Sequence, residues 1–255
     1  MARVIAIANQ KGGVGKTTTA VSLGAALSEL GARVLLVDMD SQGTLSIALG
    51  VHGINKTVYD VLRDLELAME DILVPTVTKC DLAPSNIHLA GAEVELINEP
   101  GREFLLKGKL ASVEKQYDYI LLDCPPSLGV LTLNALTAAN EVLIPVQAHY
   151  LAFRGMQLLL TTISKVKGRL NPSLEVMGIL PTFYDRRTRH SREVAEQLRE
   201  HYGEKVINIP IPATIKFADT TAAGESILTF SNSPAAAAYR KLAREVHNGK
   251  ANKRR

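Results

Sequence analysis

Short apolar runs recur along the chain, and most of them are uninterrupted rather than alternating with polar residues. They are RVIAIA, RVLLVD, YDYILLD, EVLIPV, EVMGILP and KVINIP, beginning at residues 3, 33, 117, 141, 175 and 205. Runs of Val, Ile and Leu on both faces are typical of parallel strands that helices cover on both sides. Helical patterns are predicted at 16–30, 102–116, 152–169 and 190–202. This order predicts an α/β fold: a doubly wound, mostly parallel sheet with helices on both faces.

The segment 51–98 carries short helical patterns and turn residues but no further strong strand signal. We interpret it as a peripheral helical and loop insertion. No internal repeat, low-complexity segment or interdomain linker is evident along the chain. The expected organisation is one domain over 1–248, followed by a basic, flexible tail at 249–255.

Composition is that of a soluble globular protein, with 46% hydrophobic and 22% charged residues in a chain of 255. No apolar run approaches the ~20 residues of a membrane span. The first predicted strand begins at Arg3, so we expect no signal or transit peptide. Cys80 and Cys124 form no C-x-x-C pair. We therefore expect neither a metal framework nor a disulfide, and a reducing, cytoplasmic location.

The formal net charge of +3 hides an uneven distribution. Between Tyr239 and Arg255 seven Lys or Arg face a single acid, Glu245, which leaves the rest of the chain slightly acidic. The stretch RRTRHSR, 186–192, adds four arginines and no acid. One such cluster could be an ordinary solvated face, but two favour a polyanionic partner.

The stretch NQKGGVGKTTTA, Asn9–Ala20, follows the first predicted strand and opens a helix, which is the context of a phosphate-binding loop. Its glycines let backbone N–H groups turn toward phosphate oxygens. Lys16 is expected to reach the β- and γ-phosphates, Thr17 to ligate Mg²⁺, and Thr18 to bond the α-phosphate. The loop residues predicted to bind nucleotide are Gly12, Gly13, Val14, Gly15, Lys16, Thr17 and Thr18.

The loop departs from the usual phosphate-loop pattern in one place. That pattern has a glycine five residues before Gly15, but Gln10 stands there and is followed by a second lysine, Lys11. Taken alone, this departure indicates either a damaged loop or one with an additional task.

Carboxylates end two of the predicted strands. Asp38 and Asp40 lie two residues apart and so on one side of an extended chain, at the strand end where ligands bind. Asp40 is the better candidate to hold an attacking water, and Asp38 to support a metal. Asp123 ends a strand in the Walker B pattern, whose carboxylate meets Mg²⁺, often through water. We expect Cys124 to be a packed residue and not a nucleophile.

These motifs, in this order, resemble the ParA/MinD family of deviant Walker ATPases, and in detail its Soj-type partition ATPases. The resemblance covers Arg3 to about Val246. It rests on the stretches ANQKGGVGKTTTA, VLLVDMDSQG, DYILLDCPPSLGVLTLNAL and VLIPVQAHYLAFRGMQLL.

The resemblance implies an ATPase that uses ATP and Mg²⁺ and forms an ATP-dependent sandwich homodimer. Lys11 would cross to the partner subunit and contact its nucleotide, so that Lys11, Lys16 and Asp40 are the expected catalytic residues. Asp40 would orient the hydrolytic water, and Asp123 would support the metal bound to Thr17. The purine would lie against Pro212 and Thr214.

The resemblance also implies DNA segregation. An ATP-bound dimer would bind double-stranded DNA without sequence preference, and a ParB-like or other adaptor protein would stimulate a slow hydrolysis that releases it. The protein would then be cytoplasmic and associated with the nucleoid. The candidate DNA-binding residues are Arg186, Arg187, Arg189, Arg192, Lys216, Arg240, Lys241 and Arg244.

Three other classes of protein share parts of this pattern. A MinD-like membrane-surface ATPase for spatial regulation of cell division needs an amphipathic C-terminal helix with apolar anchors, whereas the chain ends HNGKANKRR. A nitrogenase iron protein needs cluster-ligating cysteines at a subunit seam. A small-molecule kinase or synthetase needs a substrate domain or lid, which the sequence does not indicate. The cargo, whether chromosome, plasmid, chemoreceptor cluster or microcompartment, stays open.

Overall fold

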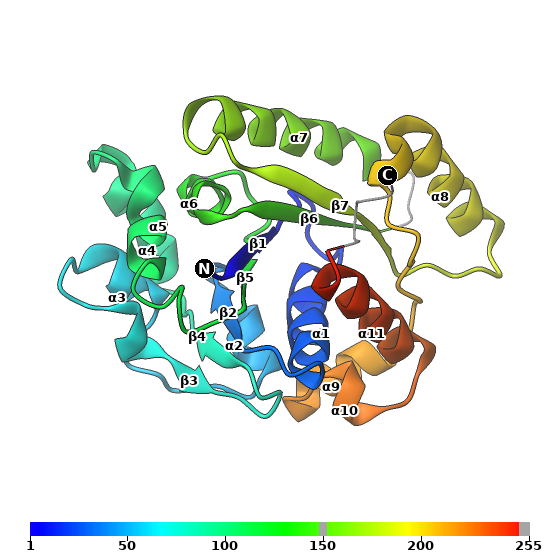
Figure 1. Cartoon of the computed structure of the whole chain (residues 1–255), viewed down its shortest axis with the longest axis horizontal. Helices are drawn as coiled ribbons and strands as arrows, with labels where there is room; N and C mark the ends of the chain where they lie inside the picture. The colour runs from blue at the N-terminus through cyan, green and yellow to red at the C-terminus, as the bar shows by residue number, and fades with distance from the viewer. Residues whose placement is uncertain (148–151, 250–255) are drawn as a thin grey trace.

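Seven strands form one sheet, and the computed structural model describes residues 1–147 and 152–249 (Figure 1). The strands are β1 (Arg3–Ile7), β2 (Val34–Asp38), β3 (Val74–Pro75), β4 (Asp81–Ala83), β5 (Tyr119–Asp123), β6 (Glu141–Gln147) and β7 (Glu175–Thr182). Their order is β3-β4-β2-β5-β1-β6-β7. All neighbouring pairs are parallel except β3 and β4. The prediction of a doubly wound, mostly parallel α/β sheet is confirmed.

Helices cover both faces of the sheet, because successive residues of each strand point to opposite sides and both sets are apolar. The helices of one face are α1 (Lys16–Glu29), α2 (Thr44–Ala48), α9 (Lys216–Ala223), α10 (Ile227–Phe230) and α11 (Pro234–His247). Those of the other are α3 (Val58–Arg63), α4 (Leu89–Glu95), α5 (Leu105–Leu110), α6 (Val130–Ala138), α7 (Ala152–Arg169) and α8 (Arg189–Tyr202). Each face has its own buried cluster of apolar side chains.

Strand order decides where a ligand can approach. From β1 the chain moves outward to β2 and β4 on one side, returns to place β5 between β1 and β2, and then continues to β6 and β7 on the other side. The carboxyl ends of β1, β2 and β5 lie side by side, with Asp123 paired in register with both Ile7 and Asp38. Ligands bind open α/β sheets at this kind of reversal.

The interpretation of 51–98 as a peripheral helical and loop insertion is wrong in one respect. The segment contributes β3 and β4, and β4 pairs in parallel with β2, with Ala83 beside Val37. The two strands have only two and three residues. Runs that short carry no period-two signal, so the sequence pattern did not indicate them.

Two further elements differ from the predicted ones. The helix predicted at 102–116 is a 3₁₀ turn, Arg102–Phe104, followed by the short helix α5. The strand predicted at 205–210 forms only isolated bridges to the β7 region, at Val206 and later at Pro212. Prolines lack the N–H that a ladder needs, and Pro210 and Pro212 interrupt this segment.

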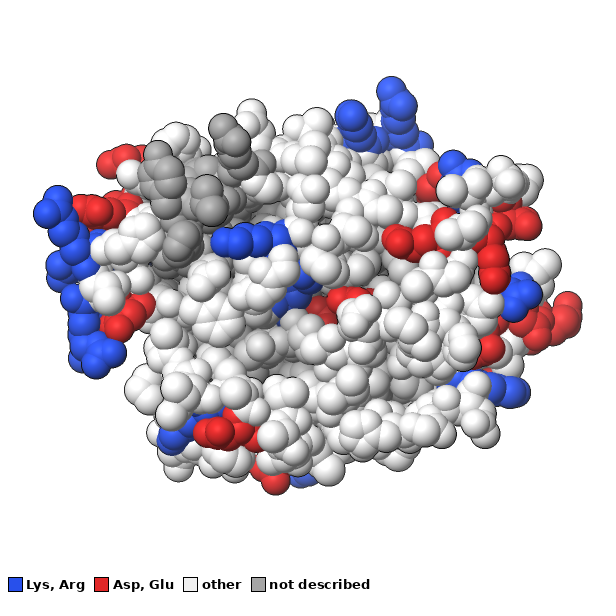
Figure 2. Space-filling view, turned by 180° about the vertical axis from the view of Figure 1, so that it is seen from behind, with Lys and Arg blue, Asp and Glu red and all other residues white. Residues whose placement is uncertain are grey.

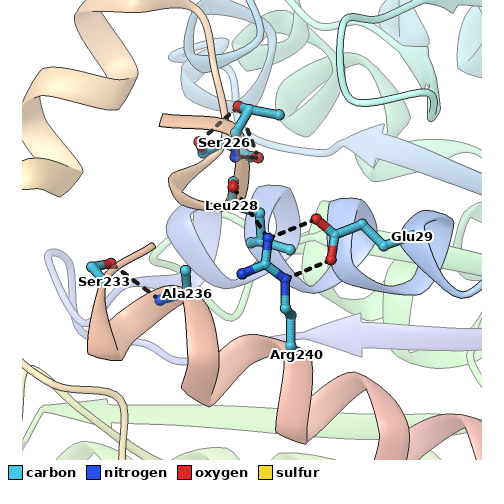
Figure 3. A network of polar contacts seen from close by, with 7 residues as sticks. Glu29, Ser226, Leu228, Ser233, Ala236 and Arg240 are labelled. Atoms are coloured by element: carbon cyan, nitrogen blue, oxygen red, sulfur yellow. Dashed lines mark hydrogen bonds and ion pairs between the residues drawn. The ribbon is translucent and has the colours of Figure 1, made fainter. Parts of the chain in front are cut away.

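The last helix, α11, packs against α1. Its Tyr239, Leu242 and Val246 are buried and form the side of the helix that faces the core. The Tyr239 hydroxyl and the Thr19 hydroxyl share a buried hydrogen bond of 3.1 Å. Figure 3 shows Arg240 reaching both carboxylate oxygens of Glu29 on α1, at 2.7 and 2.9 Å, and the carbonyl of Leu228 at 3.3 Å. The basic residues predicted for the tail at 250–255 lie outside the described residues.

Candidate active site

The phosphate loop spans the gap between β1 and α1, and both of its ends are held by side chains. Asn9 donates its amide to the carbonyl of Pro145 on β6 at 2.7 Å and accepts the N–H of Lys11 at 3.0 Å. Thr182, at the end of β7, donates its hydroxyl to the carbonyl of Val14 at 2.8 Å. The loop is therefore anchored to two strands besides its own.

Gly15 is a loop position where a side chain would be both strained and crowded. Its φ of 85° lies in the left-handed region, and a Cβ at this position would stand 3.3 Å from the ring of Phe183. Phe183 in turn packs edge-on against Phe217 of α9, with centroids 6.1 Å apart. A close contact between α1 and the segment after β7 thus sets the start of the helix.

Lys16 is the first residue of α1 and is 7% exposed. Its ammonium donates to the carbonyl of Lys11 at 3.4 Å. Burial lowers the pKa of Lys16, although the carboxylates of Asp123 and Asp40 act in the opposite direction. A buried ammonium with one weak hydrogen bond is stabilised by an anionic ligand, and the phosphate group of a nucleotide is such a ligand.

Thr17 and Asp123 meet where α1 begins and β5 ends. The Thr17 hydroxyl donates to Oδ2 of Asp123 at 2.7 Å, while the buried Oδ1 has no hydrogen-bond partner among the described atoms. Burial, followed by repulsion from Asp38, raises the pKa of Asp123 to about 8. A hydroxyl beside a buried carboxylate with a free oxygen is a donor set that suits Mg²⁺, a hard cation that prefers oxygen ligands. These residues fit the expected metal.

Asp38 is fully buried, and its two oxygens are occupied by the chain that follows it. One accepts the N–H of Asp40 at 3.1 Å, and the other accepts the N–H and hydroxyl of Ser46 at 2.9 and 2.8 Å. Burial raises the pKa of Asp38 to about 6. Asp38 therefore holds the chain from Asp40 to Ser46 in place through these hydrogen bonds. Its predicted part in metal binding stays a prediction.

Asp40 is half-buried at the start of the loop after β2. Its carboxylate accepts the N–H of Gln42 at 3.0 Å, and its carbonyl accepts the N–H of Gly43 at 2.9 Å. The negative charge of Asp40 acts on both Lys16 and Asp123, which places all three in one electrostatic site. The second oxygen of the carboxylate accepts no hydrogen bond from the described residues and could accept one from a water.

Lys11, Thr18, Pro212 and Thr214 are the other residues predicted to bind nucleotide. Lys11 is half-buried, and its ammonium forms no ion pair within the described part of the chain. Thr18 lines a small cavity of about 70 Å³ together with Phe217 of α9. Pro212 bridges Tyr184, directly after the Phe183 that contacts Gly15, and the Thr214 hydroxyl accepts the N–H of Lys216 at 3.3 Å.

The candidate DNA-binding residues separate into paired and unpaired side chains. Arg187 binds Asp185, whose pKa it lowers to about 2, Arg189 binds Glu193, and Arg240 binds Glu29. The side chains that form no ion pair or hydrogen bond with any described residue are those of Arg186, Arg192, Lys216, Lys241 and Arg244. Figure 2 shows basic and acidic side chains interspersed along the edge of the molecule where α8 lies.

Several residues that hold the site together were not found from the sequence. Asn9, Ser46, Ser85 and Thr182 each bond a loop of the site, and Phe183 has a φ of 50°, which is rare outside glycine. Asn9 and Thr182 each stand just after or at the end of a buried strand, and that position is the one signal that could have indicated them. Serine in a loop gives no comparable signal.

The described residues include no cluster of three His, Cys, Asp or Glu side chains that could chelate a metal ion by themselves. The carboxylates of the site therefore do not form a metal-binding cluster without other ligands. Cys80 and Cys124 are both buried, and burial raises the pKa of each thiol, as expected for packed cysteines. None of the described helices is long and apolar enough to cross a bilayer.

The chain is similar in sequence and in fold to several known proteins. A family model described as an AAA domain matches residues 2–176. The sporulation initiation inhibitor protein Soj of Bacillus subtilis is 44% identical, over 96% of this chain and 98% of its own length. The chromosome partitioning protein ParA of Caulobacter vibrioides is also 44% identical, over 96% and 93%.

A solved structure from Mycobacterium smegmatis, described as cobyrinic acid a,c-diamide synthase with bound ADP and magnesium, superposes with a TM-score of 0.88. It is 45% identical and covers 97% of this chain and 95% of its own. The chain carries a phosphate loop and carboxylates at its strand ends, and it is 44% identical to Soj and to ParA over 96% of its length. It belongs to the Soj/ParA family of chromosome-partitioning ATPases.

Proposed function

We propose that this chain, with residues 1–248 as its catalytic domain, binds ATP and Mg²⁺, dimerises face to face on the nucleotide, and holds DNA without sequence preference until hydrolysis releases it. The observation that carries the proposal is the meeting of Lys16, Thr17, Asp40 and Asp123 at the carboxyl ends of β1, β2 and β5. Each of these four side chains has a distinct task in phosphoryl transfer.

The phosphates would lie in the loop between β1 and α1. Lys16 would exchange its weak bond to the Lys11 carbonyl for phosphate oxygens, which offsets the cost of its burial. Thr17, through its hydroxyl, and Asp123, through its free Oδ1 and a water, would hold the metal. When bound, Mg²⁺ supplies positive charge that offsets the charge on the phosphate oxygens. Asp40 would orient the attacking water.

Lys11 supports the dimer. Lys11 is half-buried, and its ammonium forms no ion pair with any described residue. A cation reaching the partner's nucleotide makes ATP part of the subunit interface, so that dimerisation and ATP binding favour one another. The sequence offers no arginine finger beside the loop, and such a residue is worth roughly 10³–10⁵ in rate. We therefore expect slow hydrolysis that a ParB-like or other adaptor protein accelerates.

The unpaired basic side chains are the proposed DNA surface. Lys216 lies on α9, Lys241 and Arg244 lie on α11, Arg192 lies in the first turn of α8, and Arg186 lies in the turn before it. A monomer that meets a few phosphates would bind with a Kd of roughly 10⁻⁴–10⁻⁶ M. Two linked copies can gain about 10²–10⁴ in avidity, which would make nucleoid association follow the ATP state.

Binding of a labelled duplex of mixed sequence tests this function. The Asp40→Ala variant, in which we expect hydrolysis to be blocked, is titrated with ATP, with ADP and without nucleotide. We expect at least tenfold tighter binding with ATP, and binding that weakens steeply with salt. Equal affinity in the three states would contradict the switch.

The name of the Mycobacterium smegmatis structure suggests a second reaction, ATP-dependent amidation. Release of ammonia from glutamine needs an activated nucleophile, of which a cysteine thiolate is one kind. The chain has two cysteines, each 1% exposed, and burial raises the pKa of both thiols. These observations favour partition over glutamine-dependent amidation. Glutaminase activity that is lost in Cys124→Ser would reverse that choice.

A further inference from the structure

The segment 51–98, which carries no phosphate motif, reaches the loop of Asp40. β4 pairs in parallel with β2, so its carboxyl end lies beside the end of β2 at the same edge of the sheet. Pro84 and Ser85 follow β4 directly and are buried. Ser85 is therefore placed next to the turn that begins at Asp40.

Ser85 makes two hydrogen bonds to this region. Its hydroxyl donates to the carbonyl of Asp40 at 2.9 Å, and its N–H donates to the hydroxyl oxygen of Ser46 at 3.0 Å. The Ser46 hydroxyl then donates to Oδ2 of Asp38 at 2.8 Å. Ser85 is thus bonded to the backbone of one carboxylate residue and, through Ser46, to the side chain of the other.

Close packing leaves this contact little freedom. Ser85 is 8% exposed and Ser46 is 3% exposed. Gly43 has a φ of 61°, and a Cβ there would stand 3.1 Å from the carbonyl oxygen of Ser85. The turn from Asp40 to Gly43 consequently rests on the backbone of Ser85 as well as on its hydroxyl.

The turn also has an internal bond that does not depend on Ser85. The Asp40 carbonyl accepts the N–H of Gly43 at 2.9 Å, so loss of the Ser85 hydroxyl would not leave it unpaired. The internal bond sets the shape of the turn. The bond from Ser85 sets where the turn stands relative to the sheet, and hence relative to the phosphate loop.

We propose that Ser85 is a positioning residue for Asp40, and that β4 belongs to the fold of the catalytic site for this reason. The proposal rests on the role of Asp40 in orienting the attacking water, as proposed above. A displacement of about 1 Å in an orienting group can cost as much as about 10²-fold in rate. Binding of ATP should change little, because the phosphate loop is anchored by Asn9 and Thr182 on other strands.

The experiment measures kcat for ATP hydrolysis and, separately, the Kd for ATP. We expect Ser85→Ala to lower kcat about tenfold while the Kd for ATP stays within about twofold. Ser85→Thr, which restores the hydroxyl, should recover most of kcat. The matched control is Ser173→Ala, which removes one hydroxyl bond, 2.8 Å to Asn171, at the start of β7 and far from the site.

The mobility of the turn from Asp40 to Gly43 can be measured by fluorescence. The chain has no tryptophan, so Gln42→Trp would report on the turn alone, from an exposed position. In that background Ser85→Ala should lower the fluorescence anisotropy of the tryptophan, and Ser173→Ala should leave it unchanged. An unchanged kcat in Ser85→Ala would overturn the proposal, as would a parallel loss of ATP affinity or an equal effect of Ser173→Ala. Normal hydrolysis in Asp40→Ala would instead overturn the proposed role of Asp40.

Discussion

The Thr17 hydroxyl donates a hydrogen bond of 2.7 Å to Asp123, joining the first turn of α1 to the end of β5. The same carboxylate keeps a buried oxygen without a hydrogen-bond partner among the described atoms. Without a cation, ionisation of Asp123 is unfavourable, first because the carboxyl is buried and then because Asp38 lies in register with it on the next strand. The site is therefore organised around a positive charge that the chain supplies only in part, through Lys16.

The first prediction concerns the pH dependence of stability in the nucleotide-free protein. Burial raises the pKa of Asp123 to about 8 and that of Asp38 to about 6, above the ordinary value of 3.8 for both. Between about pH 4 and 8 the folded state therefore binds more protons than the unfolded state, and the free energy of unfolding falls as pH rises. We expect Tm in EDTA to fall from pH 5.5 to pH 8.5.

The Asp123→Asn variant is the control for that measurement, since its side chain does not titrate. Its Tm should change less between pH 6 and 8 than that of the wild type. Addition of ATP and Mg²⁺ should raise the wild-type Tm most at the high end of this range. An apo Tm that rises through pH 6 to 8 would mean that Asp123 is already ionised in the folded protein.

The second prediction concerns the ion pair that fastens α11 to α1 (Figure 3). Arg240 and Glu29 are partly exposed, with side-chain exposures of 28% and 41%, so the pair is worth little by itself. Arg240→Ala removes both this ion pair and the hydrogen bond to the Leu228 carbonyl, so we expect it to lower the free energy of unfolding by about 1 kcal/mol. In a chain of this size that lowers Tm by about 2–4 °C. In a double-mutant cycle measured by chemical denaturation, the effects of Arg240→Ala and Glu29→Ala on the free energy of unfolding should not be additive.

The third prediction separates the basic residues of α11 by what they contact. Lys241 and Arg244 have no partner within the described residues, whereas Arg240 is held by Glu29. Each of Lys241→Ala and Arg244→Ala should weaken ATP-dependent DNA binding on all sequences and reduce the salt dependence by about one phosphate contact per subunit. Arg240→Ala, a matched change on the same helix, should leave the salt dependence nearly unchanged. A larger effect of Arg240→Ala than of Lys241→Ala and Arg244→Ala would mean that DNA binds to another surface.

Much of the fold could be predicted because five of the seven strands are runs of apolar residues that are buried on both faces. The strand β4 was missed, since three residues carry no periodic signal, and the segment after α8 was overpredicted, since its prolines cannot complete a ladder. The phosphate loop and the carboxylates at the strand ends could be recognised because their chemistry demands particular residue types. Ser46 and Ser85 could not, because a serine that bonds a carbonyl looks like any loop serine until the chain is folded.

We propose that ATP joins two subunits through Lys11, while each subunit holds its own nucleotide through Lys16. The most direct measurement is the mass of the ATP-bound protein in solution by light scattering, in the Asp40→Ala background that we expect to block hydrolysis. We predict a dimer with ATP and a monomer when Lys11→Ala is added, with ATP still bound at a similar Kd. Lys115→Ala, an exposed lysine in the turn before β5, should still dimerise. A Lys11→Ala protein that dimerises as well as its parent, or that no longer binds ATP, would contradict the account.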